Sequence, residues 1–114
     1  MTTIRTTKQP TPSSGSIRFS AKDGKNEVGH VYLYLIWNDA HKKPYGFVED
    51  LAVNEEARGR GIARALMDKL EAKAKRERCY KLIANSNPTR KAARALYLSL
   101  GYRSHGTEFR LDLK

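Results

Sequence analysis

The clearest chemical signal is a short segment that alternates arginine and glycine directly ahead of a helical pattern. Its residues are, in order, Arg58, Gly59, Arg60, Gly61, Ile62 and Ala63. The first amide groups of a helix have no acceptor within the helix, and the helix dipole favours negative charge there. Glycine lets the main chain approach phosphate oxygens or take up positive φ, and arginine adds charge. The segment therefore favours phosphate or diphosphate binding, with a plain structural turn as the alternative.

Two adjacent carboxylates, Glu49 and Asp50, interrupt a largely apolar stretch that is typical of a strand. A carboxylate in such a place can accept a proton from a reacting group, directly or through water. Neighbouring residues of a strand point to opposite faces, so both acids reach one substrate only if a bulge rotates one of them. We expect Glu49 to be the general base, with Asp50 and a purely structural ion pair as the alternatives.

The spacing of apolar residues along the chain predicts the strands and helices that must position these groups. Alternation predicts strands at 16–21, 27–37 and 45–53, with a tight turn at Asp23-Gly24. Helical spacing predicts helices from Gly61 to about Arg76 and over 89–100, separated by a short parallel strand at 80–84. Alternation at Phe109, Leu111 and Leu113 predicts a strand of a closing hairpin.

The resulting order is β-β-β-α-β-α-β-β, an α/β (α+β) fold. We expect a mixed, mostly antiparallel sheet with a central right-handed β-α-β crossover. A chain of 114 residues fits one domain, with residues 1–15 as a flexible N-terminal tail and 16–114 as the folded part.

The net charge, the lack of long apolar runs and the single cysteine restrict the classes of partner and ligand that this protein can have. The formal net charge of +10 requires an anionic partner, which leaves nucleic acid, a membrane surface or the polyphosphate of a cofactor. No apolar run approaches the roughly 20 residues of a membrane span, and no signal peptide is evident, so a cytoplasmic protein is expected. The one cysteine, Cys79, excludes an intramolecular disulfide, and no metal site is expected.

Three stretches together resemble the GNAT superfamily of N-acetyltransferases. They are Glu49–Val53, the arginine-glycine turn Arg58–Ala63, and Ala93–Tyr102. The turn matches the family pattern Arg/Gln-x-x-Gly-x-Gly/Ala, and the last stretch matches Leu-Tyr-x-x-x-Gly-Phe/Tyr. The resemblance covers roughly residues 16–114 and implies the GNAT acyltransferase fold.

The resemblance also implies roles. Acetyl-CoA is the expected co-substrate, with its pantetheine arm along Leu51, Ala52 and Val53 where the strand bulges and splays from its parallel neighbour, and with its pyrophosphate on the turn. Tyr97 takes the place of the tyrosine that protonates or hydrogen-bonds the departing thiolate; a half-buried structural aromatic is the alternative. Arg90 and Arg94 precede Tyr97 by seven and three residues, so one helix face carries all three, where the arginines could meet the phosphates.

The chain departs from the family pattern near its start, where no helices are evident between the tail and the first strand. We therefore expect a bare sheet face that a homodimer covers. An open site favours a protein or peptide amine as acceptor over a small molecule. A non-catalytic CoA-binding protein and a basic nucleic-acid-binding protein on the same fold are the alternatives.

Overall fold

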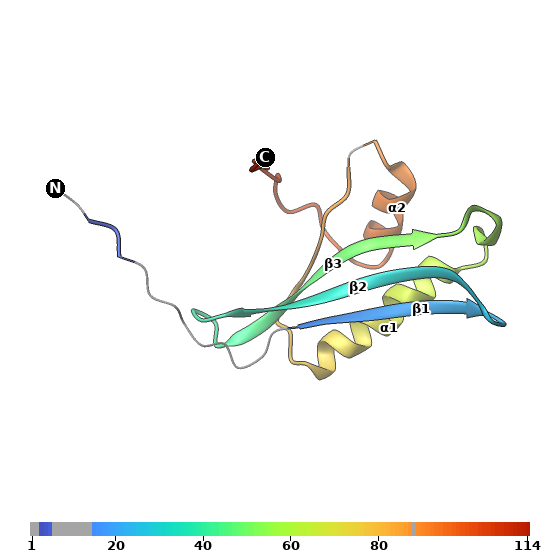
Figure 1. The fold of residues 1–114 in the computed structure, drawn as a ribbon, viewed down its shortest axis with the longest axis horizontal. Helices are drawn as coiled ribbons and strands as arrows, with labels where there is room; N and C mark the ends of the chain where they lie inside the picture. Colours follow the sequence, from blue (N-terminus) through green and yellow to red (C-terminus); the bar gives the residue numbers. More distant parts are fainter. Residues whose placement is uncertain (1–2, 6–14, 88) are drawn as a thin grey trace.

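A sheet of four strands organises the molecule (Figure 1). The computed structural model describes residues 3–5, 15–87 and 89–114. Strands β1 (Gly15–Asp23), β2 (Asn26–Asn38) and β3 (Lys43–Val53) run antiparallel, and the short β4 (Leu82–Ala84) lies parallel to β3. Their spatial order is β1-β2-β3-β4. The mixed, mostly antiparallel sheet is confirmed.

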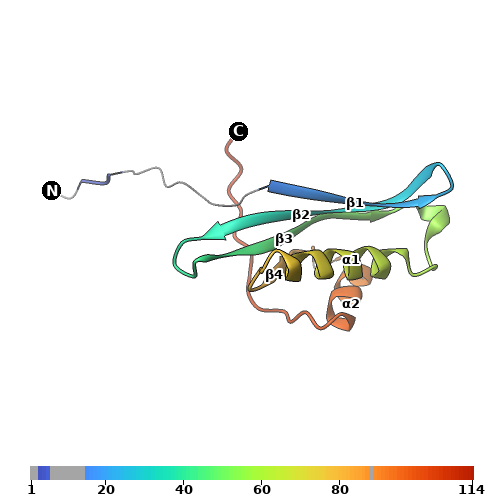
Figure 2. The same ribbon diagram turned by 90° about the horizontal axis from the view of Figure 1, so that it is seen from below.

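Both helices lie on one side of this sheet, and the first, α1 (Ile62–Arg76), packs directly on the strands (Figure 2). A 3-10 turn, η1 (Glu55–Ala57), leads from β3 to α1, and α2 (Lys91–Ser99) follows β4. Because α1 connects the parallel strands β3 and β4, the predicted β-α-β crossover is present. Figure 2 shows α1 and α2 on the same side of the sheet. Within the described residues, neither helix combines the length and apolar character that crossing a bilayer requires.

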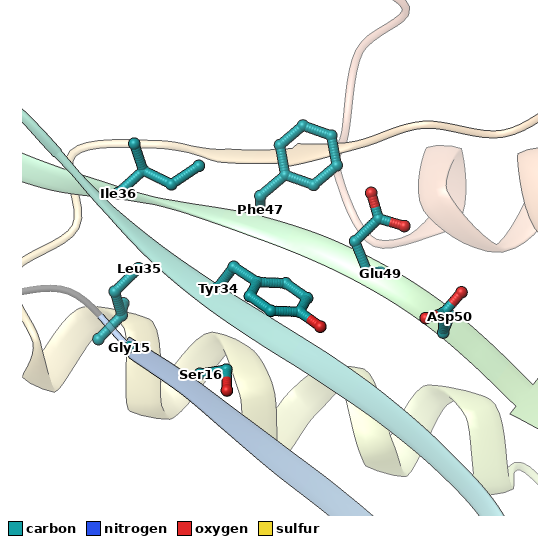
Figure 3. Close-up of a pocket in the computed structure, with 8 residues that line it drawn as sticks. All are labelled: Gly15, Ser16, Tyr34, Leu35, Ile36, Phe47, Glu49 and Asp50. Carbon is teal, nitrogen blue, oxygen red and sulfur yellow. The ribbon is translucent and has the colours of Figure 1, made fainter. Parts of the chain in front are cut away.

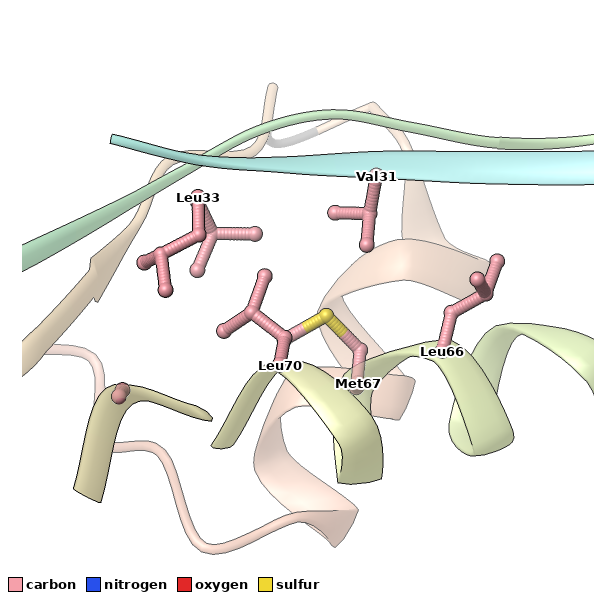
Figure 4. Packing of buried hydrophobic residues seen from close by; sticks show 7 residues of the cluster. Val31, Leu33, Leu66, Met67 and Leu70 are labelled. Atoms are coloured by element: carbon pink, nitrogen blue, oxygen red, sulfur yellow. The ribbon is translucent and has the colours of Figure 1, made fainter. Parts of the chain in front are cut away.

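The core lies between the sheet and α1 (Figure 4). Alternation along β2 directs Val31 and Leu33 to this side, and both are fully buried. Helical spacing along α1 directs Leu66 and Leu70 to meet them. Burial of each such side chain contributes roughly 1.5–3 kcal/mol. The sheet and α1 therefore form the rigid frame on which the candidate site is built.

The other side of the sheet carries a different set of side chains. Tyr32 and Tyr34 of β2 alternate with the buried residues, and Phe47 and Glu49 alternate with buried Val48 on β3. Register places Tyr34 opposite Phe47 and Tyr32 opposite Glu49. Both described helices pack on the opposite side of the sheet, so this aromatic surface, here called the open face, has no helix of the described chain over it.

Two predicted segments differ from the structure. Among the described residues no strand follows α2: residues 102–114 are irregular, and Phe109, Leu111 and Leu113 are 93%, 81% and 90% exposed. The predicted closing hairpin is wrong because alternation specifies a strand only where a neighbouring edge is available, and β4 offers an edge of three residues. Strand β1 starts at Gly15, one residue inside the predicted tail, whose residues 1–2 and 6–14 lie outside the described part.

Candidate active site

Strand β3 loses one of its two neighbours halfway along its length. Parallel pairing with β4 joins Gly46, Phe47 and Val48 to residues 82–84, and the Gly46 amide donates to the Lys81 carbonyl over 3.0 Å. Beyond Val48 the strand stays paired with β2 up to Val53. In the described chain, no strand pairs with the other edge of 49–53. On this edge the backbone of Leu51, Ala52 and Val53 has no partner among the described strands, although the Val53 carbonyl accepts a hydrogen bond from the Arg58 side chain.

A bulge in β3 reorients the acidic pair. Ala52 pairs with His30 and Glu49 with Tyr32, so β3 carries one residue more than β2 across this interval. Asp50 absorbs the irregularity with a φ of 56°, in the left-handed region that Asp tolerates better than most residues. Glu49 and Asp50 therefore line the same groove, although neighbours on a regular strand would face opposite ways.

The turn ahead of α1 leaves its amide groups free. Gly59 and Gly61 have φ values of 81° and 76°, and open space lies where a side chain would stand. The Arg58 amide donates to the Glu55 carbonyl over 3.2 Å, and the first helical bond runs from the Ala65 amide to the Gly61 carbonyl. Within the described chain, the amides of residues 59–63 donate to no backbone or side-chain acceptor, and both glycines are exposed. Five consecutive donors at a helix start can hold a phosphate group.

The two arginines of the turn contact different parts of the molecule. Arg58 donates from Nε to the Val53 carbonyl over 3.2 Å and so ties the turn to the end of β3. Arg60 is exposed and lies 3.5 Å from Asp23 in the β1–β2 turn. Because that surface pair contributes little, Arg60 can turn to a bound anion.

A third arginine, Arg64, joins the two helices, and the sequence reasoning missed it. Its guanidinium donates to the Ser99 hydroxyl over 2.7 Å, and Ser99 donates to the Leu96 carbonyl over 2.7 Å. The bond fixes α2 beside the start of α1. Its nearness to the glycine turn was the available signal, but no local pattern identifies Ser99 as its partner.

Tyr97 lies on α2, half-buried against the core. Its ring lies 5.4 Å from that of Tyr102, and the Tyr102 amide donates to its carbonyl over 3.0 Å. Burial raises the pKa of Tyr97, the nearby charge of Arg90 lowers it, and the charge of Glu49 raises it. The phenol therefore stays protonated at neutral pH, and Glu49, Arg90 and Tyr97 lie within electrostatic reach of one another. Arg94 lies one helical turn after Arg90 and is exposed, and its amide donates to the Arg90 carbonyl over 3.1 Å.

Glu49 occupies a partly buried position in an acidic neighbourhood. Burial raises its pKa, and the charges of Asp50 and Glu108 raise it further. Glu108 belongs to the irregular segment after α2 and accepts a hydrogen bond from the Asn85 side chain. Sequence reasoning missed Glu108 because no local pattern shows that the segment after α2 returns past β3.

A shallow groove on the open face connects these acids to the aromatic residues. Figure 3 shows the rings of Tyr34 and Phe47 on neighbouring strands, with Glu49 and Asp50 further along β3. The lining also includes Leu35 and Ile36 of β2 and Gly15 and Ser16 of β1. The lining reaches Asp50, the residue of the β3 bulge with positive φ. An amine that lies in it would present its nitrogen to the carboxylates.

One enzyme is similar to this chain in sequence, and several solved structures share its fold. Glucosamine 6-phosphate N-acetyltransferase of Trypanosoma brucei brucei is 35% identical over 68 residues, which are 60% of this chain and 44% of that enzyme, so the match spans less than half of the relative. The structure of a putative acetyltransferase from Agrobacterium tumefaciens str. C58 superposes with a TM-score of 0.80 at 27% identity, over 86% of this chain and 69% of that one.

A ribosomal-protein-alanine N-acetyltransferase from Brucella melitensis biovar Abortus 2308 superposes with a TM-score of 0.76 at 26% identity, over 86% of this chain and 71% of that one. The sequence pattern of the acetyltransferase (GNAT) family matches residues 4–102, most of the 114-residue chain. Together with the amides of the glycine turn and the edge of β3 that no described strand pairs, this match shows that the chain belongs to the GNAT family of acetyltransferases.

Proposed function

We propose that this protein transfers an acetyl group from acetyl-CoA to a primary amine. The observation that carries the proposal is the row of amides at residues 59–63 that donate to no acceptor in the described chain, next to the edge of β3 that no described strand pairs. Diphosphate oxygens fit the amides and the positive end of the helix dipole. A chain of amides such as pantetheine fits a strand edge that lacks a partner.

The remaining cations suit the same co-substrate. Arg60 stands on the turn, and Arg90 and Arg94 stand at the first turn of α2. We assign the pyrophosphate to residues 58–63, with these arginines as supporting charges. Leu51, Ala52 and Val53 are assigned to the pantetheine arm. Acetyl-CoA supplies an activated acyl group as a thioester.

The chemistry assigned to the site is direct attack by the amine. Glu49 accepts a proton from the acceptor nitrogen, directly or through water, and Asp50 is the alternative base. The neutral nitrogen forms a bond to the thioester carbonyl carbon while the carbon–sulfur bond breaks. Tyr97 donates its proton to the departing sulfur, and the second proton that the nitrogen releases restores the phenol. The raised pKa of Glu49 makes it a stronger base than an exposed carboxylate, and the raised pKa of Tyr97 keeps its proton in place until the thiolate forms.

The acceptor is proposed to be an amine of a protein or peptide, ahead of a small molecule. The two named relatives differ on this point, since one acts on glucosamine 6-phosphate and the other on a ribosomal-protein alanine by their names. The groove on the open face has no helix of the described chain over it, which leaves room for a polypeptide.

Calorimetric titration with acetyl-CoA, followed by an assay of CoA release with a panel of amines, tests the proposal. In Tyr97→Phe we expect acetyl-CoA affinity to stay within about twofold while kcat falls by roughly 100-fold, because only proton donation is lost. Tyr45→Phe is the matched control, since it removes a hydroxyl from the far end of β3. Failure to bind acetyl-CoA, together with salt-sensitive binding of DNA or RNA, would overturn the proposal in favour of a nucleic-acid-binding protein.

A further inference from the structure

The groove on the open face joins an apolar floor to an acidic end. Tyr34 and Phe47 are directly opposite each other in the β2–β3 register, and Ile36 extends the same floor. Cross-strand aromatic neighbours of this kind offer a broad flat surface to a ring or a branched apolar group. Glu49 and Asp50 stand at the end where β3 bulges.

The electrostatic character of this groove opposes that of the whole chain. The protein carries a formal charge of +10, yet no lysine, arginine or histidine is among the described residues that line the groove. Glu108 adds a third carboxylate close enough to raise the pKa of Glu49. The local field therefore attracts a cation, whereas the charge of the whole surface would repel one.

One cation on the open face, Arg18, is already engaged by an acid of the chain itself. The Arg18 guanidinium donates to both carboxylate oxygens of Glu27, with the Nη2–Oε2 bond at 2.7 Å, and from Nε to the Tyr32 hydroxyl over 3.1 Å. The pKa of Glu27 is lowered to about 2, chiefly by this hydrogen bonding. A phosphate on an acceptor would have to compete with Glu27 for Arg18.

We propose that the groove selects its acceptor by chemistry: a primary amine whose nitrogen is attached to an aromatic or branched apolar group and that carries no phosphate or carboxylate near it. The ammonium form is drawn to Glu49 and Asp50 while the apolar group lies on Tyr34 and Phe47. This inference rests on the proposed acetyl transfer and adds the class of acceptor. It separates this chain from a relative named for glucosamine 6-phosphate.

Matched pairs of amines test the inference by binding, in the presence of CoA, and independently by CoA release. Phenylalanine amide stands for a peptide N-terminus, and 2-phenylethylamine for a small molecule. We expect phenylalanine amide to bind about tenfold more tightly than phenylalanine, because the free carboxylate meets like charges. Glucosamine should likewise bind more tightly than glucosamine 6-phosphate, and 2-phenylethylamine more tightly than propylamine, which lacks the ring.

The variant Asp50→Asn sharpens the test, since Asn also tolerates the left-handed φ of 56° at this position. We expect the preference for phenylalanine amide over phenylalanine to shrink by about threefold as one charge is lost. Asp68→Asn is the control, because it removes the same charge from exposed α1 on the other side of the sheet and should leave the preference unchanged. Added salt should shrink the preference in the unaltered protein as well.

Several results would overturn the inference: tighter binding of glucosamine 6-phosphate than of glucosamine, equal affinity for phenylalanine and its amide, or no binding of any amine. CoA release with the reverse order of acceptors would leave the proposed transfer intact and reject the groove as its selector. The expected affinity order without CoA release from any amine would reject the transfer and keep the binding preference.

Discussion

Both halves of β3 pair with β2 on one edge, but only the first half pairs with β4 on the other edge. Residues 43–48 have β2 on one edge and reach β4 on the other through Gly46, Phe47 and Val48. Residues 49–53 keep β2 but have no described strand on the other edge. The first half contributes Val48 to the core, and the second contributes a bulge, two acids and a free backbone edge.

The difference teaches that this site arises where regular pairing stops. A fully paired strand has no backbone groups left for a ligand, and a regular strand cannot turn Glu49 and Asp50 to one groove. The same contrast holds across the turn into α1, where the amides of 59–63 stay free while those further along the helix are bonded. Substitutions in residues 49–53 should therefore change kcat, whereas substitutions in residues 43–48 should change the free energy of unfolding.

The largest expected effect is in the splayed half. Glu49→Gln should lower kcat by about 100-fold, since the amide cannot accept the proton of the amine, while the melting temperature stays nearly constant. The raised pKa of Glu49 sets the sign of its pH dependence. The carboxylate forms only above that pKa, so kcat of the unaltered enzyme should fall as pH drops through a value above the usual 4.5.

The pH profile supplies the control for this variant. Ionisation of the acceptor affects both enzymes equally, so the part of the acidic limb that disappears in Glu49→Gln belongs to Glu49. An unchanged limb would point to Asp50 or to another base.

A change in the paired half should act on stability instead. Val48 is 3% exposed and packs in the core, so Val48→Ala should lower the free energy of unfolding by about 2 kcal/mol through lost burial and a small cavity. Urea denaturation followed by circular dichroism measures the loss. The kcat of the folded fraction should stay within about twofold. A large drop in kcat would show that the two halves are not separable.

The glycine turn should show both effects at a smaller scale. Gly61 has a φ of 76°, so Gly61→Ala should cost about 1–2 kcal/mol of stability from backbone strain alone, since open space surrounds the position. Acetyl-CoA affinity should weaken by about tenfold as the amides shift. Gly24→Ala in the β1–β2 turn, with a φ of 65°, is the matched control, and calorimetry should find its acetyl-CoA affinity unchanged.

The smallest expected effect concerns Tyr102, beside the catalytic candidate. Its hydroxyl is buried with no hydrogen-bond partner in the described chain, and burial raises its pKa to about 12. Tyr102→Phe should raise the free energy of unfolding by about 1 kcal/mol because it removes an unsatisfied polar group. Thermal denaturation measures the gain. A loss of stability would indicate a partner for the hydroxyl that the described contacts do not include.

Local patterns determined much of the frame. Alternation in 27–37 puts Val31 and Leu33 on one face and Tyr32 and Tyr34 on the other, and in the structure the first pair is buried and the second lies on the open face. The helical spacing of Leu66 and Leu70 likewise puts both on one side of α1, which packs in the core. The glycine turn was recognisable because φ values near 80° favour glycine strongly, so the residue type itself indicates the backbone conformation.

Local patterns failed where the outcome depended on distant neighbours. Phe109, Leu111 and Leu113 alternate as well as any strand in the chain, yet they are exposed and irregular in the structure. Alternation says which face a side chain would take and nothing about whether an edge is available to pair with. The sequence also did not predict that Glu108 lies near Glu49 or that Arg64 donates to Ser99. Each of these contacts joins residues more than 30 positions apart in the chain.

The sequence by itself thus determined strands β1 to β4, both helices, the buried face of the sheet and the position of the glycine turn, since each depends on side chains and dihedral preferences within one short segment. Only the tertiary structure decided that β4 stops pairing at Val48, that the bulge at Asp50 brings two carboxylates into one groove, and that α2 sets Tyr97 near Glu49. These features depend on register and on packing between segments far apart in the chain, for which no single segment carries the information.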